Sequence, residues 1–216
     1  MHKIQRKLYK AYGKVANVLG EDFELFRTHE LTDPLNPANF IDTKKASFSL
    51  NDKYTTTPKE GVNEWTCYTD GRLEALFDIQ QGDFLRSVET QEKWMVTTAE
   101  VMLPIKAIKL PDTISVQRAG YGNSGSGFGP GDTEVATNIP CLIDDGNPTN
   151  GSLGYIPALN YQQEGRRVAI IWLNDANMEI EERDIVIDQN GKRLHVMSNE
   201  RTPWGNKLIV QANEAS

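Results

Sequence analysis

One β pattern occurs twice in this chain, and it constrains the fold more than any other feature of the sequence. In each copy an aspartate (Asp83, Asp184) follows a polar turn and precedes a pair of apolar residues. A second apolar strand then brings Val96, 13 residues after the first aspartate, and Val196, 12 residues after the second. An aspartate at such a turn can accept hydrogen bonds from nearby backbone N–H groups. The pattern predicts two related β modules, with chance similarity between two hairpin-rich segments as the alternative.

Other features of the two halves agree with this repeat. Trp65 and Asp70 precede the first copy, and Trp172 and Asp175 precede the second in the same order. An Asn-Gly dipeptide at 190–191 stands between two alternating runs, which is a strong signal for a β-hairpin. We therefore expect a mostly β fold of small β-barrel or sandwich modules, one or two in number, with an N-terminal amphipathic α-helix.

Alternation of apolar and polar residues is typical of strands with one buried face. It predicts strands at residues 65–68, 73–77, 83–85, 94–96, 104–110, 113–118, 134–143, 168–173, 185–187, 193–197 and 207–210. Residues 27–64, in contrast, contain several Pro and Asn turn signals and are expected to form an extended connection. The expected division is a helix at 1–20, a β module at 21–111 and a second β module at 112–216.

The first 20 residues combine a helical pattern with a local excess of positive charge. Apolar residues recur at spacings of three and four, at Ile4, Leu8, Tyr12, Val15 and Leu19, before a glycine that can end the helix. Five cations and no acid fill the other faces: Lys3, Arg6, Lys7, Lys10 and Lys14. The helix can pack on its own domain or dock on a partner, and these five cations are the candidate docking residues.

The charge balance also limits the partners that this chain can bind. The chain carries −7 overall, so the 196 residues after the basic segment sum to −12. An acidic body is a poor nucleic-acid binder, because phosphate contacts need clustered Lys and Arg. A basic segment on an acidic body suits docking on another acidic surface, either of a second copy or of a neighbouring protein. The sequence contains neither a membrane-length apolar run nor the apolar core of a secretory signal, so no membrane contact is expected.

The sequence holds no assembled catalytic or metal-binding motif. Its histidines, His2, His29 and His195, have no second His, Cys or carboxylate at a ligand spacing. Cys67 and Cys141 are far apart and match no metal spacing, so they are expected to be thiols, with a disulfide left open. We expect no enzyme activity, no metal and no cofactor.

Six glycines lie between residues 120 and 131. A phosphate-binding loop needs a strand before it, a helix after it and usually a lysine. Here a Pro-Gly-Asp turn follows without a helical pattern, and we expect a hairpin tip or a loop ordered by a neighbour. Its candidate contact residues, in the lumen of an assembly or between subunits, are Tyr121, Gly125, Gly127 and Phe128.

The second half carries a set of short motifs in a fixed order. A strand at 113–118 leads into the Gly-rich loop, and a later strand ends in Pro-Cys-Leu-Ile at 140–143. The chain closes with Asp-Ile-Val at 184–186, Gly-Lys-Arg-Leu-His-Val at 191–196 and Gly-Asn-Lys-Leu at 205–208. This arrangement resembles the head-closure, or head–tail joining, family of neck proteins from tailed bacteriophages. The additional module in the first half departs from the pattern of that family.

The resemblance implies a structural virion protein, made and assembled in the host cytoplasm and located in the phage neck or tail. Such a subunit would form a homo-oligomeric ring, join the portal or adaptor to the tail protein, and help to retain DNA that passes non-specifically through the lumen. The Gly-rich loop would reach into the lumen or a neighbouring subunit, and the basic helix would clamp an acidic partner. A tail-tube, tail-completion or baseplate-hub component is the alternative within this class. A carbohydrate-binding β-sandwich with sugar-stacking tryptophans is the alternative in another class.

Overall fold

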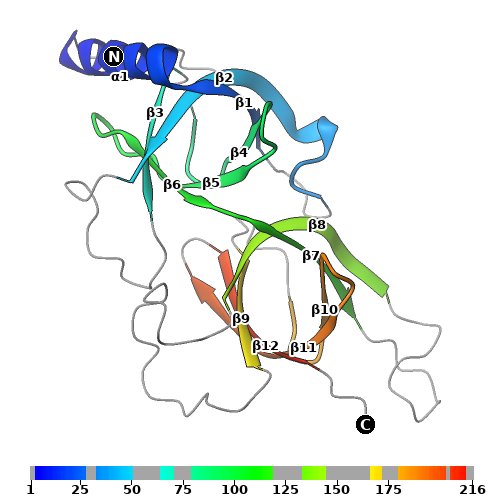
Figure 1. The fold of residues 1–216 in the computed structure, drawn as a ribbon. Coiled ribbons are helices and arrows are strands. Elements are labelled where there is room, and N and C mark those ends of the chain that lie inside the picture. The colour runs from blue at the N-terminus through cyan, green and yellow to red at the C-terminus, as the bar shows by residue number, and fades with distance from the viewer. Residues whose placement is uncertain are drawn as a thin grey trace, which may run out of the picture. The chain divides into compact units, whose positions relative to one another are not determined.

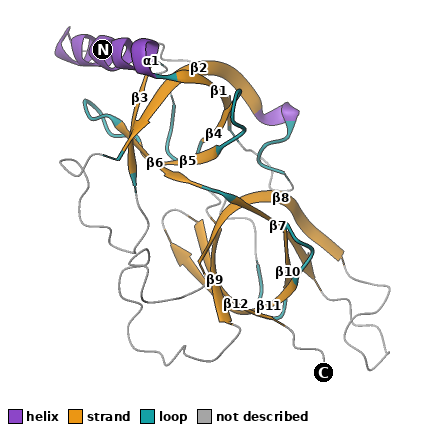
Figure 2. Cartoon of the chain, in the orientation of Figure 1, coloured by secondary structure: helices purple, strands orange, loops and turns teal. Residues whose placement is uncertain are grey.

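The computed structural model describes residues 3–27, 33–50, 64–70, 79–118, 133–144, 166–171, 180–202 and 205–212. These residues form a mostly β protein with an α-helix near the N-terminus, which confirms the predicted fold class (Figures 1 and 2). The chain divides into two compact units. Unit 1 comprises Met1–Thr28 and Leu35–Leu110, and unit 2 comprises His29–Pro34 and Pro111–Ser216.

Unit 1 contains a helix and a closed six-stranded barrel, which we call barrel 1. Its elements are α1 (Lys3–Leu19), β1 (Glu21–Phe26), the 3-10 helix η1 (Pro37–Asn39), β2 (Phe40–Ser49), β3 (Trp65–Thr69), β4 (Phe84–Ser87), β5 (Lys93–Thr98) and β6 (Ile105–Lys109). The strand order around the barrel is β1-β2-β3-β6-β5-β4, and β4 pairs back with β1. Alternate residues of each strand point inward, and buried side chains such as Phe23, Leu85 and Ile105 form the core.

Unit 2 contains a second closed six-stranded barrel, barrel 2. Its strands are β7 (Asp112–Arg118), β8 (Thr133–Asp144), β9 (Arg166–Ile171), β10 (Ile185–Asp188), β11 (Arg193–Thr202) and β12 (Gly205–Ala212). The order β7-β8-β9-β12-β11-β10 is the order of barrel 1 with each strand number raised by six. Ile114, Val116, Leu194 and Val210 are buried in its core. The two barrels therefore have the same topology.

The strand register confirms the sequence repeat at its central residues. Asp83 directly precedes β4, and Asp184 directly precedes β10. The pairing of β5 with β6 shifts register after Val96, and the pairing of β11 with β12 shifts after Val196. The repeated aspartate and valine thus occupy the same places in two barrels.

Trp65 has no tryptophan at its place in barrel 2. Trp65 on β3 pairs with Ala107 on β6, and Arg167 on β9 pairs with Val210 at the corresponding place on β12. Arg167 is therefore the counterpart of Trp65, while Trp172 and the aspartate after it lie outside the described residues. The hydrogen-bond ladder, rather than residue identity, sets which residues of the two barrels correspond.

The predicted extended connection at residues 27–64 is also wrong in part, because β2 occupies ten of these residues. Nor did the sequence patterns predict β1, in which the buried Phe23 and Leu25 alternate with charged residues. The two strands pair with each other, and Lys45 of β2 forms an ion pair with Asp22 of β1 at 2.9 Å. Charged cross-strand pairs of this kind stabilise a sheet but weaken the hydrophobic pattern by which strands are recognised.

Helix α1 packs on β2 and β3 of barrel 1 (Figure 1). Its buried face consists of Tyr9, Gly13 and Ala16, two of which are small and allow the helix to approach the strands closely. Ile4 and Leu19, which the sequence pattern assigned to the apolar face, are 66% and 74% exposed. The helix was predicted correctly, but its predicted apolar face is not the buried one, because Leu8, Tyr12 and Val15 between them are only half-buried.

Candidate functional site

A buried aspartate forms a fork-shaped ion pair with an arginine in barrel 1. Asp83 is only 2% exposed and accepts hydrogen bonds from Nε and Nη2 of Arg27 at 2.8 and 2.7 Å. It also accepts a hydrogen bond from the backbone N–H of Gln80 at 2.7 Å. The arginine follows β1 and the aspartate precedes β4, so the pairing of Phe26 with Phe84 places the two residues side by side. Three donors thus hold the carboxylate in place.

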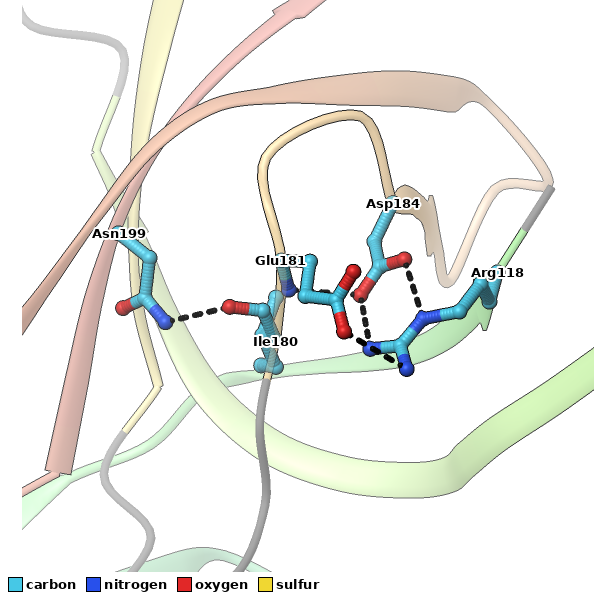
Figure 3. A network of polar contacts seen from close by, with 5 residues as sticks. All are labelled: Arg118, Ile180, Glu181, Asp184 and Asn199. Atoms are coloured by element: carbon cyan, nitrogen blue, oxygen red, sulfur yellow. Dashed lines mark hydrogen bonds and ion pairs between the residues drawn. The ribbon is translucent and has the colours of Figure 1, made fainter.

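Barrel 2 repeats this arrangement (Figure 3). Asp184 accepts hydrogen bonds from Nε and Nη2 of Arg118, both at 3.1 Å, and from the backbone N–H of Glu181 at 2.8 Å. The Glu181 carboxylate forms a second ion pair with Arg118 at 3.0 Å. On the other side of the turn, Nδ2 of Asn199 donates to the carbonyl of Ile180 at 2.8 Å. We call the two sites the Asp forks.

The backbone around the Asp forks is repeated as closely as the side chains. The residue before each aspartate has a positive φ, +87° at Gly82 and +82° at Arg183. The N–H of this residue donates to the carbonyl of Val96 or Val196, at 2.8 and 2.9 Å. The valine N–H in turn donates to the aspartate carbonyl at 2.9 Å in both barrels. Each fork therefore ties the turn before a strand to the neighbouring strands on both sides.

The Asp forks are suited to stabilising the barrels. A carboxylate held by a bidentate arginine and a backbone N–H links the end of one strand firmly to the turn before another. Within the described ranges, no group of three or more His, Cys, Asp or Glu residues could hold a metal ion. Sequence reasoning singled out both aspartates but missed Arg27 and Arg118. Arg27 directly follows β1, and Arg118 is the last residue of β7. Only the strand register brings each arginine next to its aspartate.

Helix α1 carries all the charged residues among the predicted site residues. All five predicted docking residues, Lys3, Arg6, Lys7, Lys10 and Lys14, are exposed on it. No described carboxylate forms an ion pair with any of these five cations. We call these five residues the basic face. Exposed apolar side chains lie at both ends of the helix, Ile4 near its start and Val18 and Leu19 at its end, with exposures of 66%, 80% and 74%; we call these three residues the apolar flank.

The remaining predicted site residues lie elsewhere. The Gly-rich loop with Tyr121, Gly125, Gly127 and Phe128 falls outside the described residues, as do His2 and His29. His195 is half-buried on β11. Cys67 and Cys141 are buried, one in each barrel, and burial raises the pKa of the Cys67 thiol. Neither thiol is placed as a nucleophile, because a reactive cysteine needs an accessible thiolate.

Comparisons with protein-family models, with curated proteins and with solved structures find no match to this chain. The described part of the chain contains no helix that is long and apolar enough to span a membrane. Function must therefore be inferred from the residues of the chain itself. The basic face and its apolar flank form the candidate site that best fits contact with a partner protein.

Proposed function

We propose that this protein is a structural virion subunit of a tailed bacteriophage. In this proposal it forms a ring in the neck, joins the portal or adaptor to the tail, and helps to retain packaged DNA. The resemblance of the second half to head-closure proteins motivates the proposal. The helix α1, with its basic face, is the element that would hold a neighbouring acidic subunit.

The exposed basic face is the observation that supports this proposal best. A helix that served only to cover barrel 1 would need just its buried face, Tyr9, Gly13 and Ala16. This helix instead presents five cations together with exposed apolar side chains such as Val18. Charge complementarity with an acidic surface accelerates encounter, and adjacent apolar side chains add the buried area that keeps two proteins together. The net charge of −12 outside residues 1–20 means that a second copy of the chain could offer such a surface.

The barrels fit the same role. Small closed barrels expose no free sheet edge along most of their circumference, so they can be arranged around an axis without uncontrolled strand pairing. A heterologous contact, in which helix α1 of one copy binds a different surface of the next, closes into a ring when the rotation between copies permits it. An acidic lumen would let DNA slide through without adhering, because phosphate binding needs clustered cations.

The first test is the assembly state of the full chain, alone and mixed with the products of its neighbouring genes. Native mass spectrometry and negative-stain microscopy should reveal a closed ring, either of the protein alone or on a partner. The symmetry and stacking of that ring would separate a neck subunit from a tail-tube, tail-completion or baseplate-hub component. A strict monomer under every one of these conditions would refute the proposal.

The second test addresses the basic face directly. Lys10→Glu should weaken the assembly at least several-fold, and the loss should grow in the triple variant that adds Lys7→Glu and Lys14→Glu. Lys192→Glu, an equal charge change at an exposed residue of barrel 2, is the matched control and should leave assembly intact. The affinity of the wild-type contact should also fall as salt is raised, since exposed charges are screened. Unchanged assembly of the triple variant would show that the helix is not the docking element.

A further inference from the structure

A pocket of about 410 Å³ opens in unit 1, where the end of α1 meets the start of β1. Strands β2, β3 and β5 and the end of β6 complete its wall. The size falls in the range of about 300–1,000 Å³ that is typical of small-molecule sites, and the mouth of a β-barrel is a common place for such a site. The pocket is separate from both Asp forks and does not include the basic face.

Four aromatic residues line this pocket: Phe23, Phe48, Trp65 and Trp94. Phe48 stacks on Trp94 with ring centroids 3.9 Å apart and an interplanar angle of 11°. Trp65 stands nearly perpendicular to Trp94, at 5.4 Å and 81°. Trp94 is buried, whereas Phe48 and Trp65 are only half-buried. These two half-buried rings are the aromatic surface that a ligand could contact.

Charged groups of both signs lie beside the aromatic rings. The carboxylate of Glu92 forms an ion pair with the ammonium of Lys109, and both side chains line the pocket. The Lys109 ammonium also lies 5.8 Å from the ring centroid of Trp94. Glu21 contributes a second carboxylate and Ser47 a hydroxyl group to the lining. Hydrogen-bond donors and acceptors therefore stand next to an apolar aromatic surface.

The duplicated fold provides an internal comparison for this set of residues. By strand register, Phe23 corresponds to Ile114 of barrel 2, Phe48 to Ile143, Trp65 to Arg167 and Trp94 to Leu194. None of these counterparts is aromatic. The counterpart of Lys109 is Ala212, and that of Glu92 is Lys192. A barrel of this topology therefore closes without these aromatic residues or this ion pair. In barrel 1 Phe23 and Trp94 belong to the core, and Phe48 and Trp65 pack against it, so the exposed parts of these last two rings are what a ligand could contact.

We propose that this pocket binds a neutral sugar residue. Its ring would lie against Phe48 and Trp65, and its hydroxyl groups would bond to the Glu92 carboxylate and the Lys109 ammonium. A cationic ligand is disfavoured because Lys109 already occupies the position near the Trp94 ring. An anionic ligand is disfavoured because two carboxylates line the pocket. A sugar fits because it combines a weakly polar ring face with an edge of hydroxyl donors and acceptors. This inference does not depend on a place in a virion.

The test uses the full chain and a panel of named probes. Tryptophan fluorescence and titration calorimetry would be measured with glucose, galactose, mannose, rhamnose and N-acetylglucosamine. Choline and galacturonate serve as the cationic and anionic probes, and a glycan array of bacterial polysaccharides extends the panel. We expect saturable binding of at least one neutral sugar and none of choline or galacturonate. The proposal is overturned if no neutral sugar binds in either format, or if only a charged probe does.

Three variants tie the binding to this pocket. Glu92→Gln removes a charged acceptor and should weaken the affinity about tenfold or more. Glu89→Gln, in the same β4–β5 turn but outside the pocket lining, is the matched control and should bind normally. Phe48→Ile introduces the residue that barrel 2 carries at this position, so the barrel should remain folded by circular dichroism while sugar binding is lost. Full affinity in folded Phe48→Ile would also overturn the proposal.

Discussion

Replacing Asp83 with asparagine should destabilise barrel 1 far more than the loss of a surface ion pair would. The carboxylate is 2% exposed and accepts three hydrogen bonds of 2.7 to 2.8 Å, two from Arg27 and one from Gln80. Asparagine has nearly the same shape, so the core packing is preserved. Its amide nitrogen, however, is a donor and faces groups that are themselves donors. At least one buried N–H group loses its acceptor, and the ion pair is broken.

The size of the effect follows from the burial of the two partners. Removing one partner of a buried ion pair lowers the free energy of unfolding by about 3–5 kcal/mol. A hydrogen bond to a charged group contributes about 1.5–3 kcal/mol. The Arg27 side chain is 21% exposed, so part of its charge can be rehydrated in the variant. We therefore expect a loss at the low end, about 3 kcal/mol in the free energy of unfolding of barrel 1.

The duplicated site supplies a second, weaker case of the same substitution. In barrel 2 the two arginine bonds to Asp184 are longer, at 3.1 Å, and the Arg118 side chain is 39% exposed. After Asp184→Asn, Arg118 keeps its ion pair with Glu181 and its contact with water. The expected loss is about 2 kcal/mol, discounted for this exposure. Asp83→Asn should therefore destabilise its barrel more than Asp184→Asn does.

Urea unfolding, followed by tryptophan fluorescence and by hydrogen exchange of peptides from each barrel, would measure both losses separately. Asp22→Asn is the matched control, because Asp22 and Lys45 are 53% and 37% exposed, and a pair of this kind contributes less than about 1 kcal/mol. If Asp83→Asn lowers the free energy of unfolding no more than Asp22→Asn does, the fork does not stabilise the barrel. A greater loss for Asp184→Asn than for Asp83→Asn would refute the link between exposure and effect.

Other changes should have equally specific effects. Arg183→Gly should raise the stability of barrel 2 by about 0.5–1 kcal/mol in urea unfolding, because a φ of +82° strains any residue other than glycine; an unchanged midpoint would count against that strain. Gly20→Ala should lower the free energy of unfolding by about 1–3 kcal/mol, because its Cβ would lie 2.3 Å from the carbonyl oxygen of Ala46. A melting temperature equal to that of the wild type would contradict this close approach. Cys67 and Cys141 should resist iodoacetamide in the native protein at neutral and mildly alkaline pH, because burial keeps the thiols from the reagent and raises the pKa of Cys67 so that it stays protonated. Mass spectrometry should detect both adducts only after unfolding, and labelling of the folded protein would show that the barrels open.

The sequence by itself determined those features that depend on neighbouring residues. The alternation of apolar and polar residues located most strands, and the Asn-Gly dipeptide located the β10–β11 hairpin, in which Gly191 has a φ of +78°. The repeated aspartate and valine revealed the duplication, because each turn is closed by hydrogen bonds within a short stretch of chain. The pattern failed at β1 and β2, where charged residues interrupt the apolar ones and Asp22 forms an ion pair with Lys45 across the two strands.

Only the tertiary structure decided which distant residues meet. Arg27 and Asp83 are 56 positions apart, and nothing local in either segment marks them as partners. The aromatic pocket likewise gathers residues from α1 to β6, and the packed face of the helix depends on the shape of the strands beneath it. The physical reason is barrel closure. Once hydrogen bonds fix the register of six strands, every side chain acquires neighbours that its own sequence context does not specify.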